Sequence, residues 1–135
     1  MAIINTYTKC LDSPYLIEDK DAALRVGGLM STAADRLEAA ANINHTGQGD
    51  QADVSFLSYE AMFNCLRALV YQTGYREMGL RCLMLACEHH YVRTGLLDPG
   101  HIHAFERAQG LKRPPAENLA AASAFVKRTI EILRG

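Results

Sequence analysis

The sequence predicts an all-α fold, an antiparallel up-and-down bundle of four to five helices. Apolar residues recur three or four positions apart over most of the chain, which is the period of a helix with one buried face. Gly74, Gly95 and Gly110 interrupt these patterns at intervals that suit helices joined by short connections. We find no segment with the alternation typical of a half-buried strand. A chain of 135 residues is long enough to bury one core.

The N-terminal segment differs from the rest of the chain. We expect an arm over residues 1–17 and a single helical domain over residues 18–135. The arm has no clean period, and Asp12, Ser13 and Pro14 predict a turn in it, because Asp and Ser bond to the nearby backbone and Pro fixes φ. We expect this arm to pack on the bundle or on a second subunit.

The first long helix is predicted over residues 18–43. Gly27 and Gly28 lie within it, and each Gly costs about 1 kcal/mol relative to Ala. A kink, or a neighbour packed against the bare backbone, would explain the pair. The polar, Gly-rich residues 45–53 that follow predict a loop. The buried stripe of this helix is Val26, Leu29, Ala33, Leu37 and Ala40.

The helix predicted over residues 54–73 is the element around which the others are arranged. Asp53 can cap its first turn, and Gly74 ends it, because Gly adopts a left-handed closing conformation without a steric penalty. Its inward stripe is Phe56, Tyr59, Phe63, Leu66 and Val70. Arg67 lies among these apolar residues and needs an acidic partner if it is buried. The candidate partners are Glu60, Glu77 and Glu88.

Three more helices are predicted after Gly74. Their expected ranges are residues 77–94, 100–109 and 116–133. Asp98 and Pro99 start the second of these, since Asp caps a helix and Pro is favoured in its first turn. Pro114 and Pro115 require an extended connection before the last. The inward stripes are Leu80, Leu83, Met84, Cys87 and Tyr91 in the first of these helices and Leu119, Ala122, Val126, Ile130 and Leu133 in the last.

Composition excludes some classes of function. The net charge of -1 gives no general electrostatic case for nucleic acid or an anionic membrane as partner. No apolar run approaches the roughly 20 residues that span a bilayer, so we expect no membrane association. Cys65, Cys82 and Cys87 lie in apolar helical patterns, where a free Cys behaves as a small core residue. Because the N-terminus has no signal-peptide pattern, we expect a cytoplasmic protein with reduced thiols.

One stretch of the sequence is similar to a known family. Tyr59, Ala61, Ala68, Gly74, Tyr75 and Arg76 form the pattern Y-x-A…A-L…G-Y-R. Together with Ala124, Phe125 and Val126 in the last helix, this pattern resembles the HEPN superfamily over about residues 18–133. The resemblance implies a four- or five-helix bundle that forms homodimers, in many cases beside a nucleotidyltransferase in a toxin–antitoxin pair. Active members are metal-independent endoribonucleases that carry an Arg followed four to six residues later by a His.

The chain departs from that catalytic pattern. Leu80 and Arg81 stand where the family has its two histidines, and residues 107–113 read RAQGLKR without the expected Arg-Asn pair. The resemblance therefore implies a non-catalytic or weakly catalytic domain. Such a domain would act through dimerisation and through binding of RNA, a nucleotide or a protein partner of the nucleotidyltransferase type. The alternatives are a ribonuclease toxin with a rebuilt site and a plain helical interaction module without a ligand.

A rebuilt catalytic site could consist of His89, His90 and Arg93, which lie close together at a helix end. There a His would act as acid or base and the Arg would stabilise phosphate charge. The alternative is a solvated helix end, since His and Arg favour the negative end of the helix dipole. Five further residues are candidates for binding a ligand: Tyr75, Arg76, Arg81, His101 and His103.

Metal and cofactor chemistry is not predicted. Four residues are acceptable zinc ligands by type, but their spacing matches no zinc pattern: Cys87, His90, His101 and His103. The sequence has no phosphate loop, nucleophile elbow or paired-carboxylate signature. We expect no metal and no cofactor.

Overall fold

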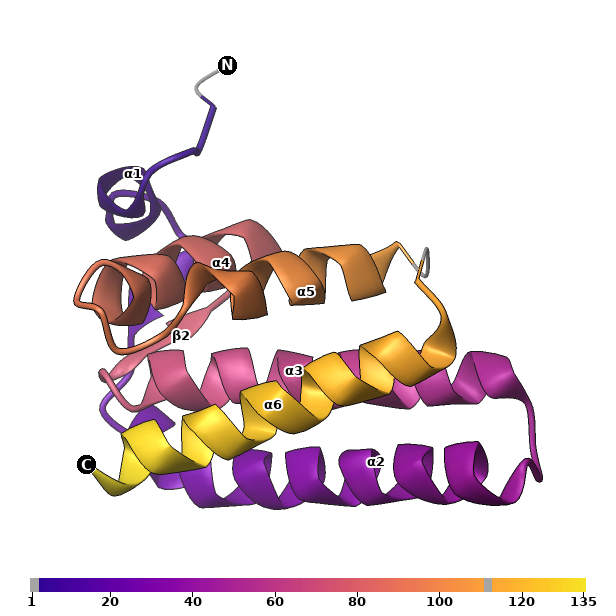
Figure 1. The fold of residues 1–135 in the computed structure, drawn as a ribbon. Coiled ribbons are helices and arrows are strands. Elements are labelled where there is room, and N and C mark those ends of the chain that lie inside the picture. The colour runs from indigo at the N-terminus through magenta and orange to yellow at the C-terminus, as the bar shows by residue number, and fades with distance from the viewer. Residues whose placement is uncertain (1–2, 111–112) are drawn as a thin grey trace.

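The computed structural model describes residues 3–110 and 113–135 as an all-α helical bundle, as the sequence predicts. The central helix, α3, packs against all four other long elements of the bundle (Figure 1). In chain order these helices are α2 (Val26–Thr46), α3 (Gln51–Tyr71), α4 (Leu80–Cys87), α5 (Pro99–Gln109) and α6 (Pro115–Arg134). In the described residues, no helix combines the length and the apolar character that crossing a membrane requires.

The start of α3 lies earlier than predicted. Asp50, not Asp53, is its N-cap, and the Asp50 carboxylate accepts a hydrogen bond from the Ala52 amide at 2.9 Å. The connection from α2 is therefore much shorter than residues 45–53. Phe56, predicted to face inward, is 55% exposed. Ser55 is buried in this turn instead, where its hydroxyl accepts a hydrogen bond of 3.0 Å from the Asn118 amide of α6.

The segment before α2 was predicted to belong to the first long helix, but it is not α-helical. It forms a short strand, β1 (Leu16–Glu18), and a 3-10 turn, η1 (Ala22–Arg25). Gly27 and Gly28 consequently lie in the first turn of α2. No atom lies within 4 Å of a Cβ built on either Gly, so no neighbour is packed against the bare backbone there.

Two short strands were not predicted. β1 pairs antiparallel with β2 (Tyr75–Glu77), which follows Gly74 at the end of α3. Each strand has three residues, too few to show a period of two in the sequence. The pairing fixes the chain before α2 to the chain after α3. The ion pair between Arg76 Nε and Asp19 Oδ2, 2.9 Å apart, lies beside the same ladder.

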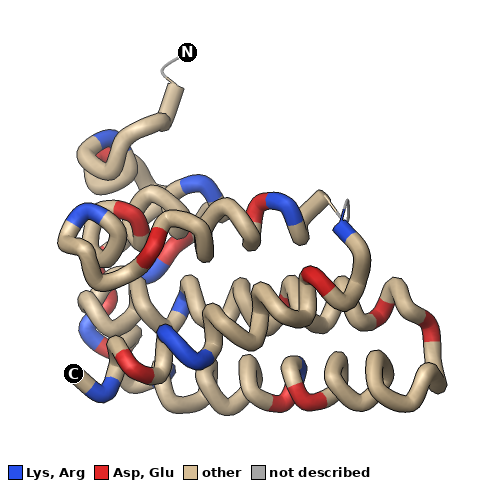
Figure 2. The backbone as a smooth tube through the Cα atoms, in the orientation of Figure 1, with Lys and Arg blue, Asp and Glu red and all other residues tan. Residues whose placement is uncertain are grey.

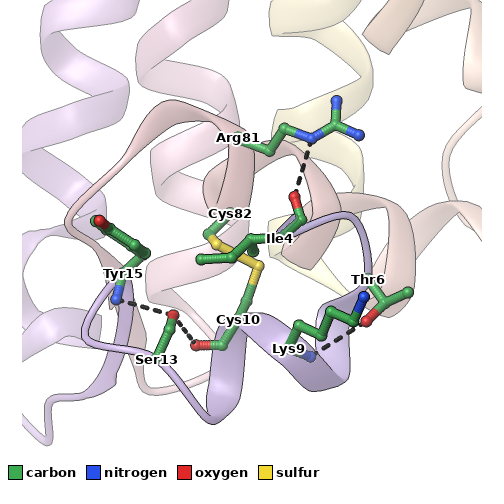
Figure 3. The surroundings of a disulfide bond; sticks show 8 residues. All are labelled: Ile4, Thr6, Lys9, Cys10, Ser13, Tyr15, Arg81 and Cys82. Atoms are coloured by element: carbon green, nitrogen blue, oxygen red, sulfur yellow. Dashed lines mark hydrogen bonds between the residues drawn. A yellow bond between two sulfur atoms is a disulfide. The ribbon is translucent and has the colours of Figure 1, made fainter. Parts of the chain in front are cut away.

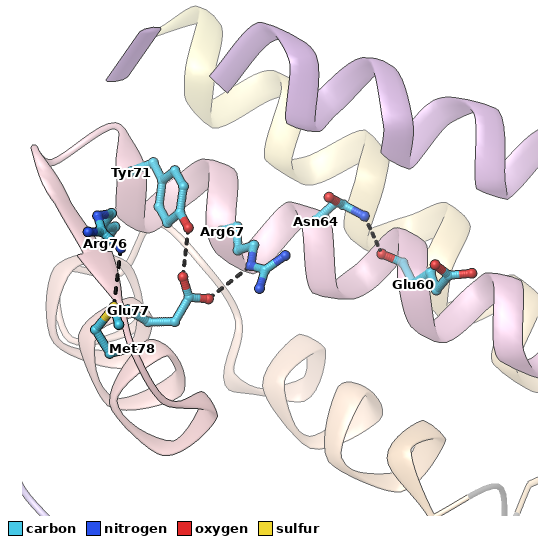
Figure 4. Close-up of polar contacts among 7 residues, drawn as sticks. All are labelled: Glu60, Asn64, Arg67, Tyr71, Arg76, Glu77 and Met78. Carbon is cyan, nitrogen blue, oxygen red and sulfur yellow. Dashed lines mark hydrogen bonds and ion pairs between the residues drawn. The ribbon is translucent and has the colours of Figure 1, made fainter. Parts of the chain in front are cut away.

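Glu77, one of the three predicted candidates, is the partner of Arg67, and it is the carboxylate of the pair that is buried. Arg67 Nε lies 2.9 Å from Glu77 Oε2, and the Tyr71 hydroxyl donates to Glu77 Oε1 at 2.7 Å (Figure 4). The guanidinium of Arg67 also lies 4.3 Å from the centre of the Phe63 ring. Burial, and secondly the bond to Glu77, raises the pKa of Tyr71 to about 12. This cluster attaches β2 to the end of α3.

The helix predicted over residues 77–94 is not one continuous α-helix. α4 ends at Cys87 and continues as a π-helical turn, η2 (Glu88–Val92), which is closed by a bond of 3.0 Å from the Arg93 amide to the Glu88 carbonyl. π turns are rare and occur frequently at functional sites. The predictions for α5 and α6 are confirmed to within one residue at each end, and Asp98 caps α5 by accepting from the Gly100 amide at 2.7 Å.

The cysteine prediction is wrong in one respect. Cys82 is not a free core thiol, because it forms a disulfide with Cys10 in the arm (Figure 3). The prediction that all thiols are reduced is therefore wrong for Cys10 and Cys82. Cys65 and Cys87 are free and buried as predicted. Burial raises the pKa of both thiols, that of Cys65 to about 12, so neither is a thiolate at neutral pH.

Candidate functional site

The arm packs on the bundle, one of its two predicted positions. Its helix, α1 (Tyr7–Leu11), is capped by the Thr6 hydroxyl, which accepts from the Lys9 amide at 3.2 Å. α1 contacts α4 at the end of the bundle that carries the chain termini (Figure 1). Residues 1–2 of the predicted arm lie outside the described residues.

Tyr7 engages both histidines of η2. Its ring stacks on His89 with centroids 3.9 Å apart and planes 7° from parallel. Its hydroxyl oxygen lies 2.9 Å from His90 Nε2. The two imidazoles are nearly perpendicular, with centroids 5.0 Å apart. One aromatic side chain from the arm therefore covers the pair of residues that the sequence places at the candidate catalytic centre.

The protonation states of this pair follow from burial. Desolvation, followed by the charge of His89, lowers the pKa of His90. Desolvation, followed by Tyr75, raises the pKa of Tyr7. At neutral pH, His90 is thus a neutral imidazole and Tyr7 a neutral phenol. Tyr7 and His90 share a hydrogen bond between the hydroxyl and Nε2, and the tautomer of His90 decides which of the two groups donates.

A polar cavity of about 330 Å³ lies between the arm and the bundle. It is lined by residues of the arm and of α4, η2 and the residue after η2: Asn5, Thr6, Tyr7, Thr8, Leu85, Glu88, His89 and Arg93. His89 Nδ1 is buried and has no hydrogen-bond partner among the residues that the structure describes. A guanidinium, an imidazole and two threonines thus meet at one site, with one carboxylate among them.

This arrangement is better suited to binding than to acid–base catalysis. An Arg beside hydroxyl groups offers charge-assisted and neutral donors to a phosphate. Acid–base cleavage of RNA with His89 and His90 would require both rings to reach the substrate. His90 does not line the cavity, and its Nε2 is already hydrogen-bonded to the Tyr7 hydroxyl.

The five predicted ligand residues are not brought together. None of them lines the cavity: Tyr75, Arg76, Arg81, His101 and His103. Tyr75 and Arg76 lie in β2, and His103 is exposed on α5. Arg81 is near the cavity but has another role, because its Nε donates to the Ile4 carbonyl of the arm at 3.3 Å.

His101 packs against α6. Its ring stacks on Phe125 with centroids 5.2 Å apart. Desolvation lowers the pKa of His101, and Arg128 lowers it further against the opposing effect of Asp98. His101 is therefore a packing residue between two helices.

Replacing His101 with Gln is expected to reduce the slope with which the free energy of unfolding falls as the pH is lowered. Because the folded-state pKa of His101 is lowered, the unfolded chain binds the proton more tightly, and the free energy of unfolding falls as the pH drops below about 6.5. The fall ends once the lowered pKa has been passed. Urea unfolding between about pH 5 and 7.5 measures the slope. His103→Gln, on the same helix but exposed, should leave it unchanged; an unchanged slope in His101→Gln would contradict the assignment.

Metal ligation is not built into the described part of the chain. Within residues 3–110 and 113–135, no three His, Cys, Asp or Glu side chains are arranged to hold a metal ion. Of the four zinc-type residues, Cys87 is fully buried and His90 is bonded to Tyr7.

A second hollow is apolar and lies between α2 and α6. Its volume is about 490 Å³, and most of its lining is small or aliphatic: Ala34, Leu37, Glu38, Ala41, Ala116, Leu119, Ala120, Ser123 and Val126. Between Asn118 and Val126, α6 carries no charged residue (Figure 2). This face differs sharply in chemistry from the polar cavity.

The arm residues of the polar cavity were not predicted from the sequence. Tyr7, Asn5 and the two threonines lie in a segment without periodicity, and only contacts distant in sequence give them a role. Cys10 was the one available signal, since a Cys outside the helical patterns is free to pair. The sequence could not say which of the other three cysteines it pairs with.

Compared with protein-family models, with curated proteins and with solved structures, the chain has no significant match. The resemblance to the HEPN superfamily stays a prediction from the sequence pattern.

Proposed function

We propose that the chain is a HEPN-like, non-catalytic domain that binds the phosphate of an RNA or nucleotide in the cavity between α1 and η2. The observation that carries this proposal is the convergence of Arg93 and His89 with the threonines of the arm on one cavity. Arg is the side chain best suited to a phosphate, because its planar guanidinium can donate two parallel hydrogen bonds. The aromatic stack of Tyr7 on His89 offers an edge against which a base could pack.

The charge distribution favours a local site over a general affinity for nucleic acid. Acidic and basic residues are mixed at the end of the bundle that carries α1, with no face of one sign in that view (Figure 2). Glu88 lines the same cavity as Arg93, so its carboxylate opposes an anionic ligand. Binding should therefore be modest and sensitive to salt.

Arg93→Ala is expected to weaken binding of a short fluorescein-labelled single-stranded RNA, or of a fluorescent ATP analogue, by about 10- to 100-fold. Loss of a charge-assisted hydrogen bond costs about 1.5–3 kcal/mol. Glu88→Gln should tighten binding, because it removes the opposing charge. Fluorescence anisotropy at fixed salt measures both effects.

Arg107→Ala is the matched control for this experiment. Arg107 is exposed on α5, does not line the cavity, and its replacement changes the net charge by the same amount. Equal losses in Arg93→Ala and Arg107→Ala would show that binding is only a response to net charge. The absence of binding of either probe would leave the third function, an interaction module without a ligand.

The ribonuclease alternative predicts a different result. If His89 and His90 act as acid and base, cleavage of the RNA probe should occur and should disappear in the double variant His89→Ala/His90→Ala. Retained cleavage would exclude this site, and no cleavage in the wild type would support binding without catalysis.

The proposal includes a homodimer, a protein partner and a cytoplasmic location. Homodimerisation is expected from the resemblance, and the apolar hollow between α2 and α6 is a surface that helices of a second copy could cover. A partner of the nucleotidyltransferase type is likewise proposed on the resemblance alone. A cytoplasmic location is kept as a proposal, although the Cys10–Cys82 disulfide is unusual for that compartment.

A further inference from the structure

The arm is held in two different ways along its length. From Tyr15 onward it is fixed by backbone hydrogen bonds, since the Met78 amide donates to the Tyr15 carbonyl at 2.8 Å and β1 pairs with β2. Further toward the N-terminus it depends on side chains. Figure 3 shows two of these contacts, the disulfide and the exposed bond of 3.3 Å from Arg81 to the Ile4 carbonyl. Tyr7 makes the others, with the two histidines.

The disulfide is the dominant contact of that second part. α1 has five residues, and so short a helix is not stable unless it is packed or tied down. Cys10 and Cys82 are both buried, and the bond between them joins α1 directly to α4. Tyr7 precedes Cys10 by three residues, close to one helical turn, so the disulfide determines where the Tyr7 ring can lie.

We propose that the Cys10–Cys82 disulfide is a redox-sensitive latch that keeps Tyr7 on His89 and His90, and that its reduction releases residues 3–14 and takes the arm's half of the lining away from the cavity. The strand pairing beyond Tyr15 remains intact in the released state and retains the rest of the chain. The functional consequence rests on the proposed ligand site, because the threonines of the arm line that site and leave it when the arm is released.

The chemistry requires a dithiol reductant. A thiolate of the dithiol attacks one sulfur of the disulfide to form a mixed disulfide, and its second thiol then displaces the protein sulfur. The dithiol loses two electrons and becomes a disulfide, while Cys10 and Cys82 each end as a thiol. Because both sulfur atoms are buried, attack follows a transient opening of α1. Cys65 and Cys87 do not compete, since they are buried and protonated.

This latch reconciles the disulfide with a cytoplasmic location. Disulfides in reducing compartments are mostly transient, and many of them act in redox sensing. In such a compartment the arm would be released and the cavity incomplete. A low-molecular-weight disulfide, itself reduced to two thiols by exchange, would oxidise Cys10 and Cys82 and restore the cavity.

Limited trypsin digestion tests the latch without any ligand. Lys9 lies in α1, next to Cys10, so cleavage after Lys9 reports release of the arm. We expect the rate of this cleavage to rise about tenfold or more when the wild-type protein is reduced with dithiothreitol and alkylated, since local release exposes the segment to the protease. The double variant Cys10→Ser/Cys82→Ser should be cleaved at the fast rate with or without dithiothreitol. Far-ultraviolet circular dichroism checks that the helices persist.

Two results would overturn the latch. One is an unchanged rate of cleavage after Lys9 in reduced protein whose disulfide is shown by mass spectrometry to be broken. The other is loss of the helical signal with cleavage in α6 after Lys127 or Arg128, which would show that reduction unfolds the bundle rather than the arm.

Binding of the RNA probe in both redox states separates the latch from the proposed function. Faster cleavage after Lys9 without RNA binding in either state would support the latch and reject the ligand site. Equal binding in both states with equal cleavage rates would support the ligand site and reject the latch. In Tyr7→Ala, with the disulfide intact, cleavage after Lys9 should stay slow, because the disulfide still holds α1 on α4. Fast cleavage in that variant would show that the Tyr7 contacts, and not the disulfide, hold the arm.

Discussion

Replacing Phe105 with Ala is expected to lower the free energy of unfolding by about 3–5 kcal/mol. Phe105 of α5 is fully buried, stacks on Tyr59 with ring centroids 5.0 Å apart, and meets Phe63 edge-on at 5.9 Å. Its removal deletes the aromatic cluster that joins α5 to α3 and leaves a cavity that rigid neighbours cannot fill. Urea or guanidinium unfolding followed by circular dichroism measures the change.

Phe56→Ala is the matched control for that prediction. The substitution is again Phe to Ala, but Phe56 is 55% exposed. The free energy of unfolding should therefore change by no more than about 0.5 kcal/mol. A large loss in Phe56→Ala would mean that this side chain is covered in solution, as the sequence pattern predicted. Similar losses in the two variants would contradict the placement of α5 against α3.

Removal of the disulfide is expected to lower the free energy of unfolding by about 2–5 kcal/mol. The bond joins residues 72 positions apart, and a cross-link over so long a stretch strongly restricts the unfolded chain. Denaturant unfolding with and without dithiothreitol measures the effect in the wild type. Cys10→Ser/Cys82→Ser should show the lower stability in both conditions.

The double variant also controls for other effects of the reductant. A loss of stability on adding dithiothreitol to that variant would point to some process other than reduction of this bond. Equal midpoints for oxidised and reduced wild type would contradict the predicted contribution of the disulfide.

The sequence predicts the bundle well because burial of a helix face repeats over many residues. The inward stripes of α2 and α6 span several turns each, and a pattern of that length is hard to mistake. Glu77 was one of the three carboxylates that the sequence offered to Arg67, and the structure pairs the two. The buried charge of this pair is that of Glu77, since the side chain of Arg67 is 39% exposed. Helix boundaries were less accurate, as the N-cap at Asp50 shows.

The site was harder to predict because its parts meet only in three dimensions. His89 and Arg93 were recognisable as neighbours on one helix end, but the side chain that covers the histidines, Tyr7, lies in an arm without periodicity. The π turn of η2, which positions them, has no pattern in the sequence that distinguishes it from an α-helix. The strands β1 and β2 escaped prediction because three residues carry no usable period.

The pairing of β1 with β2 has a consequence for how this protein could diverge. It joins the chain just before α2 to the chain just after α3. The α2–α3 hairpin and the hydrogen bonds between β1 and β2 therefore form a closed ring. Most of the polar cavity is supplied from outside this ring, by the arm that precedes it and by η2 that follows it. Substitutions in those two segments can change the lining of the cavity while the ring keeps its packing. The framework of the bundle and the cavity that we propose as the ligand site are thus built from separate segments of one short chain.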